Sequence, residues 1–553
     1  MLTQGWAHGN GPRVARYLLV ALSLGAAACN GTDPGMSGAG GGRRQEATLV
    51  PRSGGTVVLG LPSDLDSFNP YLSTQAQARD VTFQCYASLM EEQADFGQGP
   101  PTFLPALAAS WEFSADRKEI TFHLQPDAVW EDGRPVTAND VRFSHQAAIS
   151  PEVGWLGAEV KTQIESVEVM DPKTVRFRFA RVYPYQLMDA NDGVILPEHV
   201  WSKVPFREWR SSGLDRHPVC SGAFTLERWT PNQSIEMVRN DRSFPGETPY
   251  LDRVIFQILP DAASGAEQLM AGQIDFWDRL SPELLPRLES QERVAVRRYP
   301  DRRYSFIAWN CARPLFRSAA VRRALTLAIN RRRIVDDIYR GTAQLASGGI
   351  PPLYWAHDTS VKPHPFDAGA ARDLLESAGW RDSDGDGLLD REGKIFRFDL
   401  EVPASSAIWR DIALMVQEDL RRVGIQASPV VYDRNVFNSR HSRHEFDAFI
   451  GAWRLPTKVD LAVIFTTAAI HNGGNYGGYS NSQLDVLLDK VRKVEDIRQA
   501  GHLLDRAQVI LHREQPYTFL AWQDRITGFS ARIRNIQPNA QSPLFHLRQW
   551  WIP

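Results

Sequence analysis

The spacing of apolar side chains in the first half of the chain predicts β-strands. In residues 173–180, the apolar Val175, Phe177 and Phe179 alternate with polar or charged residues. Successive side chains of a strand point to opposite faces, so this alternation is typical of a strand with one buried face. Further strands are expected at residues 54–61, 121–125, 234–239 and 253–259.

From about residue 318 the apolar period changes, and amphipathic helices alternate with short strands. One helix is expected to begin after Asp367 and end at Gly379, a second to end at Gly424, and a third to begin after Asn481. Their apolar positions are Ala370, Ala371, Leu374, Leu375 and Ala378; Ile412, Val416, Leu420 and Val423; and Leu484, Leu487, Leu488 and Val491. Interleaved strands and helices predict an α/β protein.

The N-terminus has the order of an export signal. Polar residues that include Arg13 and Arg16 precede the apolar run 17–28, and Cys29 follows it. A helix that spans a bilayer needs roughly 20 apolar residues, so this run is too short to be a transmembrane anchor.

Small residues directly before a cysteine resemble the lipobox of bacterial lipoproteins, in which the cysteine is acylated and becomes the new N-terminus. Residues 1–28 are therefore expected to be a lipoprotein signal peptide, Cys29 to carry lipid, and residues 29–49, rich in glycine, to form a flexible tether. Plain signal cleavage is the alternative. The lipid would hold the protein in the cell envelope, in the periplasm or on the cell surface.

Charge and cysteine content narrow the picture further. The 62 Lys and Arg against 65 Asp and Glu leave no basic excess, which excludes nucleic acid as a partner. The length of 553 residues predicts about three domains. Apart from Cys29, the cysteines are Cys85, Cys220 and Cys311, so either one disulfide with a free thiol or three thiols are possible.

The common catalytic motifs are absent: there is no phosphate-binding Gly-rich loop, no dinucleotide fingerprint, no zinc-protease motif and no serine-hydrolase elbow. His441 and His444 have a spacing that a metal could use, but their polar segment favours a solvated face. The acidic run 382–390 has the spacing of a calcium loop, yet Gly393 stands where the completing glutamate is needed. An acidic turn is the favoured interpretation, and no metal or cofactor is expected.

One segment is more specific. Residues 105–114 read Pro-Ala-Leu-Ala-Ala-Ser-Trp-Glu-Phe-Ser, and after a strand the chain makes a tight turn at Glu131-Asp-Gly-Arg-Pro135. Thr137 and Asp140 then form the pattern of a capping box that opens a helix.

Residues 105–144 resemble the family 5 extracellular solute-binding proteins, the oligopeptide, dipeptide and nickel binding class that feeds ABC importers. Departures from the family pattern include Pro126, Asp127 and Cys220. The same resemblance continues at residues 65–70, 218–224, 321–331, 371–380, 446–453 and 478–481.

The resemblance implies a periplasmic-binding-protein type 2 fold, an α/β architecture of two hinged lobes plus an extra domain. Such a protein binds a solute without catalysis, and we expect a monomer. The implied division is lobe I at 50–80, 210–305 and 520–553, the extra domain at 81–209, and lobe II at 306–519. The implied partners are a short peptide or small solute, and the permease and nucleotide-binding subunits of an ABC importer.

By the same resemblance, the solute lies between the lobes. The expected ligand-binding residues are Thr74, Gln75 and Ala76 on one wall and Ala452, Trp453 and Arg454 on the other. Peptide-binding members carry, three residues after this tryptophan, an aspartate that pairs with the α-ammonium of the peptide. Pro456 stands there in this chain, and the nearest carboxylate is Asp460.

Two interpretations of this departure stay open. Asp460 could replace the missing aspartate from a different loop, or the solute could lack a free amine; Arg454 and Lys458 would then favour an anionic group. The sequence therefore predicts a membrane-tethered receptor for a peptide or peptide-like solute. The alternatives are a receptor for a sugar, metal chelate or anion, a sensory or chaperone-like relative, and, least favoured, a hydrolase.

Overall fold

The computed structural model describes residues 50–75, 77–244 and 248–553. The expected signal peptide, the lipidated Cys29, the tether and Ala76 lie outside the described residues. No helix in the described part is both long enough and apolar enough to cross a bilayer.

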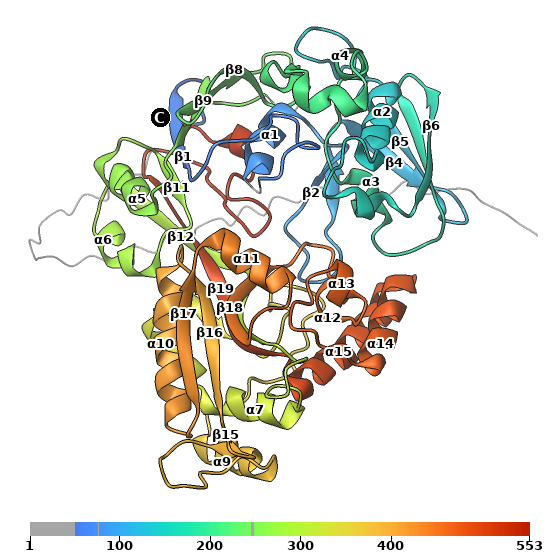
Figure 1. Ribbon diagram of the computed structural model, residues 1–553. Coiled ribbons are helices and arrows are strands. Elements are labelled where there is room, and N and C mark those ends of the chain that lie inside the picture. The colour runs from blue at the N-terminus through green and yellow to red at the C-terminus, as the bar shows by residue number, and fades with distance from the viewer. Residues whose placement is uncertain (1–49, 76, 245–247) are drawn as a thin grey trace, which may run out of the picture. The chain divides into compact units, whose positions relative to one another are not determined.

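The largest element is an 11-stranded mixed sheet (Figure 1). Ten strands follow the order β17-β16-β18-β12-β19-β11-β1-β10-β9-β8, and β13 pairs with β19. Their bounds are β1 (Thr56–Leu61), β8 (Phe224–Thr230), β9 (Ser234–Arg239), β10 (Arg253–Ile258), β11 (Phe276–Asp278), β12 (Val294–Trp309), β13 (Ala343–Leu345), β16 (Arg397–Pro403), β17 (Gln426–Tyr432), β18 (Ala448–Arg454) and β19 (Tyr517–Ser530).

Two long antiparallel strands, β12 and β19, connect the two ends of this sheet. Near Val294, β12 pairs with the part of β19 that adjoins β11, and from Arg303 onward it pairs with β18. The ladder between β12 and β19 is interrupted between Pro300 and Tyr304. We call the part built on β1 and β8–β11 the β1 half and the part built on β16–β18 the β18 half; only β12 and β19 belong to both.

A separate four-stranded sheet has the order β4-β5-β7-β6. Val175, Phe177 and Phe179 are buried on one face of β7, which confirms the predicted alternation. The capping box of Thr137 and Asp140 is also confirmed, and it opens the helix α2. The bounds are β2 (Met90–Glu92), β3 (Phe103–Pro105), β4 (Ala108–Phe113), β5 (Glu119–Leu124), β6 (Ile164–Asp171), β7 (Thr174–Phe179) and α2 (Ala138–Ile149).

Helices dominate the chain between residues 319 and 514. Asp367 caps α9 by accepting a hydrogen bond from the Ala370 amide at 2.9 Å, and Asn481 caps α14 in the same way. Gly379 and Gly424 follow α9 and α10 with φ of +85° and +80°, values that favour glycine. The bounds here are α7 (Ala319–Ala328), α8 (Arg331–Asp337), α9 (Ala368–Ser377), α10 (Ala407–Arg421), α11 (Arg434–Ser442), α12 (Ala462–Phe465), α13 (Ala469–Asn472), α14 (Ser482–Lys493) and α15 (Ile497–Glu514).

One apolar core runs without a break from the β1 half into the four-stranded sheet, where it includes Phe122 and Trp130. Two other cores lie in the β18 half, on either side of its strands, and a small one packs α5 and α6. The remaining bounds are α1 (Ala78–Cys85), α3 (Gln186–Asn191), α4 (Glu198–Trp201), α5 (Ala262–Ala271), α6 (Leu285–Glu289), β14 (Asp390–Arg391) and β15 (Lys394–Ile395). The division into two lobes and an extra domain stays a prediction.

A disulfide joins Cys85, the last residue of α1, to Cys220, and Cys311 is a free thiol. The structure thus selects one of the two arrangements that the sequence left open. The bridge closes a loop with a sequence separation of 135 residues. Closure of so long a loop restricts the unfolded chain and stabilises the folded one.

Replacing both Cys85 and Cys220 by serine is expected to lower the free energy of unfolding by about 2–5 kcal/mol. Urea denaturation with and without reducing agent measures this. Reduction should lower the stability of the wild type and leave that of the double variant unchanged, because Cys311 has no bridge to lose. Equal responses of the two proteins would contradict the expected role of the disulfide.

Candidate functional site

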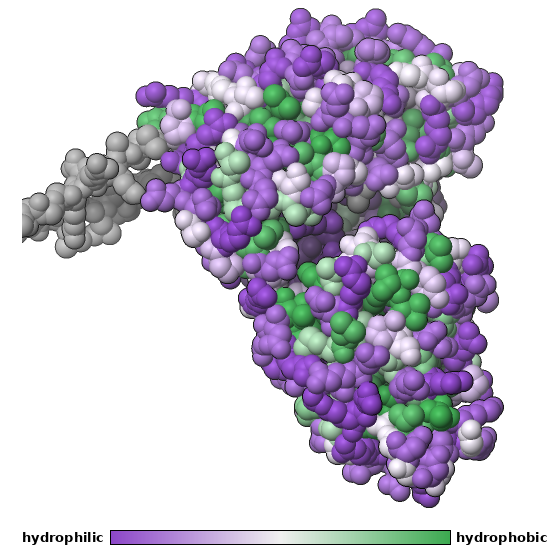
Figure 2. All heavy atoms as spheres, turned by 60° about the vertical axis from the view of Figure 1, so that its left-hand side comes forward, coloured by the Kyte–Doolittle hydropathy of each residue, from purple (hydrophilic) through white to green (hydrophobic). Residues whose placement is uncertain are grey.

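The molecule is hollowed between the β1 half, above, and the β18 half, below (Figure 2). Lys458 of the β18 half also contacts α3, where its Nζ lies 2.9 Å from Asp189 Oδ2. The interruption of β12 and β19 lies where the two halves meet.

On the β1 half, the expected wall residue Thr74 is held by its own loop. Its amide and its hydroxyl donate to Asp66 Oδ2 at 2.8 and 2.7 Å. Burial alone would raise the pKa of Asp66, but the hydrogen bonds from Ser73 and Thr74 lower it. Gln75 is exposed, and Ala76 lies outside the described residues. The Asp66 carboxylate therefore fixes the conformation of this wall.

On the β18 half, Ala452, Trp453 and Arg454 end strand β18. The half-buried Trp453 ring is nearly parallel to the rings of Tyr476 and Phe306, with centroids 5.9 and 6.4 Å away. Phe306 in turn stacks on Tyr517 at 4.1 Å. Trp453 thus belongs to an aromatic layer that could receive an apolar part of a solute, and its role in binding stays a prediction.

The backbone edge of β18 is open beside Trp453. One edge pairs with β12 from Ala448 to Arg454, whereas the other pairs with β16 only at Ala448 and Phe449. Within the described chain, no other strand pairs with Ile450–Arg454 on that second edge. Unpaired amide and carbonyl groups of a strand edge can pair with an added extended chain.

The cations that the sequence offered for an anionic solute already have carboxylate partners. Arg454 Nε lies 3.2 Å from Asp301 Oδ1, and its Nη2 donates to the Ala540 carbonyl at 2.8 Å. Lys458 contacts both oxygens of Asp189, at 3.0 and 2.9 Å. These charges hold the structure together and are not free for a solute.

Asp460 is occupied in the same way. Its Oδ2 accepts hydrogen bonds from Arg492 at 2.9 and 2.7 Å, and its Oδ1 accepts one from the Ala462 amide. Beside it, the Pro456 carbonyl accepts a hydrogen bond from the Tyr354 hydroxyl at 3.0 Å. An ammonium group could use Asp460 only by displacing Arg492.

Two charged residues that the sequence did not suggest lie at the interruption. Arg302 is 8% exposed and Glu92 is mostly buried, and each has a buried polar atom without a hydrogen-bond partner. Burial lowers the pKa of Arg302 to about 10 and raises that of Glu92. No sequence motif marks either residue, because their burial arises only when the halves meet.

The other hollow of note is a cavity of about 300 Å³ in the β18 half, lined by residues that include Arg331, His364 and Phe366. The Arg331 guanidinium donates to three backbone carbonyls, among them that of Phe519 at 2.7 Å. The Arg331 guanidinium is therefore used to stabilise the β18 half, and its charge is not available to a solute in this cavity.

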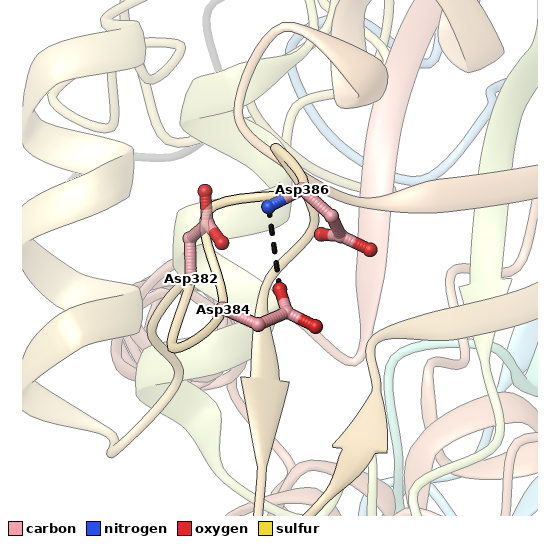
Figure 3. Close-up of side chains that lie close together, drawn as sticks. All are labelled: Asp382, Asp384 and Asp386. Atoms are coloured by element: carbon pink, nitrogen blue, oxygen red, sulfur yellow. Dashed lines mark hydrogen bonds between the residues drawn. The ribbon is translucent and has the colours of Figure 1, made fainter.

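The acidic run forms the expected turn (Figure 3). Asp382, Asp384 and Asp386 are exposed, with one oxygen of each within 4.8 Å of the others. Their carboxylates accept hydrogen bonds from backbone amides of the same loop, including that of Gly385 to Asp382 at 2.8 Å and that of Asp386 to Asp384 at 3.2 Å. These bonds account for the acidic spacing.

The interpretation of His441 as part of a solvated face is wrong. The ring is 3% exposed and packs against Phe437 and Phe449, with centroids 3.9 Å from each. Its Nε2 lies 3.3 Å from Glu401 Oε2, yet burial lowers the pKa of His441. Because the neighbours of His441 in the sequence are polar, the sequence did not indicate that this residue is buried.

Comparison with known proteins gives a consistent result. Residues 102–468 match the family model of the bacterial extracellular solute-binding proteins, family 5 (middle region). The oligopeptide-binding protein AppA of Bacillus subtilis is 27% identical over 549 residues, 97% of each chain. The dipeptide-binding protein of Escherichia coli is 25% identical over 481 residues, 82% of this chain and 87% of its own.

Solved structures agree. AppA of Bacillus subtilis in complex with a nonapeptide has a TM-score of 0.77 at 27% identity, covering 91% of this chain and all of its own. NikZ of Campylobacter jejuni in complex with Ni(L-His) has a TM-score of 0.78 at 22% identity, covering 90% and 99%. The second likeness concerns the fold alone.

The contact between Lys458 and Asp189 generates a prediction. Lys458→Met leaves the Asp189 carboxylate, 3% exposed, without its cation and should cost about 1–3 kcal/mol of unfolding free energy. Lys493→Met is the matched control, because Lys493 and Asp489 form an exposed pair that contributes about 0.5 kcal/mol or less. Urea denaturation measures both, and equal losses would contradict the difference.

Proposed function

The chain belongs to the bacterial extracellular solute-binding proteins, family 5, and we propose that it captures a peptide or peptide-like solute and delivers it to the permease of an ABC importer. Proteins of this family are transport receptors and not enzymes. In this proposal the solute lies between the β1 half and the β18 half, and the protein acts as a monomer.

The observation that carries the peptide version is the open edge of β18 beside Trp453. An extended peptide that adds to this edge forms main-chain hydrogen bonds, which do not depend on its sequence. The aromatic layer around Trp453 then receives side chains of the peptide. Likeness to AppA, over nearly the whole of both chains, supports the same ligand class.

The connection by β12 and β19 supports a hinged mode of binding. Because these two strands belong to both halves and their ladder is interrupted after Pro300, the proposed hinge lies at this interruption. Closure removes water from the bound solute, and the closed form is the state that a permease can distinguish.

A second candidate is a solute without a free amine, such as an anion or a metal chelate. Pro456 and the ion pair of Asp460 with Arg492 favour it, since both remove the carboxylate that an ammonium group would need at this loop. NikZ, with its bound Ni(L-His), shows that this fold accommodates a chelate.

The peptide proposal is tested with the purified protein and a library of tripeptides to nonapeptides. Peptides at 100 times their dissociation constant should raise the stability by about 2.7 kcal/mol, seen as a higher Tm. Mass spectrometry should recover the peptides intact. Trp453→Ala should reduce the shift, whereas consumption of the peptides, or no shift at any concentration, would contradict the proposal.

Delivery is tested separately. Purified permease and nucleotide-binding subunits in vesicles should hydrolyse ATP faster with the peptide-loaded protein than with the unloaded protein. An unchanged rate would leave a sensory or chaperone-like role.

We also propose that Cys29 carries lipid and tethers the protein to a membrane of the cell envelope. Cys29→Ser should then move the protein from the detergent phase to the aqueous phase on Triton X-114 partition, because the acyl chains are its anchor. Cys311→Ser, which retains the lipid, is the matched control. Equal partition of wild type and Cys29→Ser would contradict lipidation.

A further inference from the structure

Arg302 is a buried cation for which the protein provides no counter-ion. Its side chain has no carboxylate oxygen within 4.0 Å among the described residues, and its Nε has no hydrogen-bond partner. The backbone is nevertheless fixed on both sides: its amide donates to Asp301 Oδ1 at 2.8 Å, and its carbonyl accepts from Leu455 at 2.9 Å. A buried, unpaired charge is costly, so its position calls for a partner.

The residues that influence the Arg302 guanidinium come from both halves. Tyr354 and Arg454 belong to the β18 half, whereas Arg79 in α1 and Glu92 in β2 belong to the β1 half. The Arg302 guanidinium therefore lies among side chains of both halves, where the proposed solute would lie. The Tyr354 hydroxyl interacts with it but is neutral, and Arg454 and Arg79 make the surroundings still more positive.

Glu92 presents the opposite charge from the opposite side. Its Oε1 is buried without a hydrogen-bond partner, and no Lys, Arg or His nitrogen of the described chain lies within 4.0 Å of its carboxylate. Its charged neighbours are Arg79 and Arg302, and its side chain meets Thr457, the residue after Pro456. Arg302 and Glu92 thus face one space without forming an ion pair with each other.

On the premise of the proposed function, we propose that Arg302 binds the carboxylate of a peptide and Glu92 binds its ammonium group, so that the solute is a zwitterionic short peptide. The planar guanidinium donates two parallel hydrogen bonds to a carboxylate, a geometry that suits a terminal carboxyl group. The two ends fix the length and the direction of the peptide, while the edge of β18 pairs with the main chain between them.

A purely structural role for Arg302 does not explain why its side chain lacks a carboxylate partner. The arginines that stabilise the fold nearby all have fixed acceptors: Arg525 pairs with Asp278, Arg454 with Asp301, and Arg331 with backbone carbonyls. Arg302 instead has only the neutral Tyr354 hydroxyl, and its Nε has no hydrogen-bond partner. Removal of its charge should relieve a cost in the unloaded protein and appear as a loss only when solute binds.

The test uses a random tripeptide library in four forms: free, N-acetylated, C-amidated and capped at both ends. Competition binding with recovery by mass spectrometry compares the wild type with Arg302→Gln and Glu92→Gln. Arg302→Gln should bind the free and N-acetylated forms about 10- to 100-fold more weakly, and should bind the C-amidated forms as the wild type does. Glu92→Gln should show the complementary loss, for the free and C-amidated forms only.

Arg303→Gln is the matched control, because the adjacent Arg303 lies over Trp409 and outside the proposed contacts. It should leave the preference among the four forms unchanged. The Tm of unloaded Arg302→Gln should equal or exceed that of the wild type, whereas a structural arginine would lower it.

The outcomes separate this assignment from the proposed function. Equal binding of all four forms by the wild type would overturn the roles of Arg302 and Glu92 and leave the peptide receptor standing. Binding of no form by the wild type would overturn both. A fall in the unloaded Tm of Arg302→Gln, with parallel weakening of all four forms, would make Arg302 a structural residue.

Discussion

The arrangement of this protein depends on the two strands that pass between its halves. A β-ladder is stiff while it is continuous, and the ladder of β12 and β19 is open between Pro300 and Tyr304, with a second register shift between Ser305 and Phe306. The three residues within this gap are Asp301, Arg302 and Arg303, all charged. The backbone of this segment still has partners on the other edge of β12, because the Arg302 carbonyl accepts a hydrogen bond from the Leu455 amide and Arg303 pairs with Arg454 of β18. The Asp301 side chain also pairs with Arg454.

The charges around this gap form two groups with different roles. Arg525 and Asp278 neutralise each other, and although burial alone would lower the pKa of Arg525, the ion pair raises it. Arg302 and Glu92 lack such partners. A buried charge without a partner is destabilising, so on the proposed assignment these two residues lower the stability of the unloaded form and gain their counter-charges from the solute.

Local patterns in the sequence predicted local structure well. The alternation in β7, the capping box of Thr137 and the end of α10 at Gly424 each depend on residues within a few positions of one another. The family and fold class followed from motifs that occur in order along the chain. Trp453 lies within one of these motifs, and its role in binding stays a prediction.

Pairings between distant residues could not be predicted in this way. Lys458 and Asp189 are 269 positions apart in the sequence, and Asp460 and Arg492 are 32 apart. These ion pairs form only because the fold brings the residues together. His441 is surrounded by polar residues in sequence yet is packed among rings from elsewhere.

The disulfide also joins residues that are distant in the sequence. It holds the Cα atoms of Cys85 and Cys220 only 4.8 Å apart, so the chain between them leaves and re-enters the β1 half at almost one point. The disulfide therefore fixes both ends of this segment at one point, while the segment itself shares an apolar core with the β1 half and carries Glu92 and Asp189.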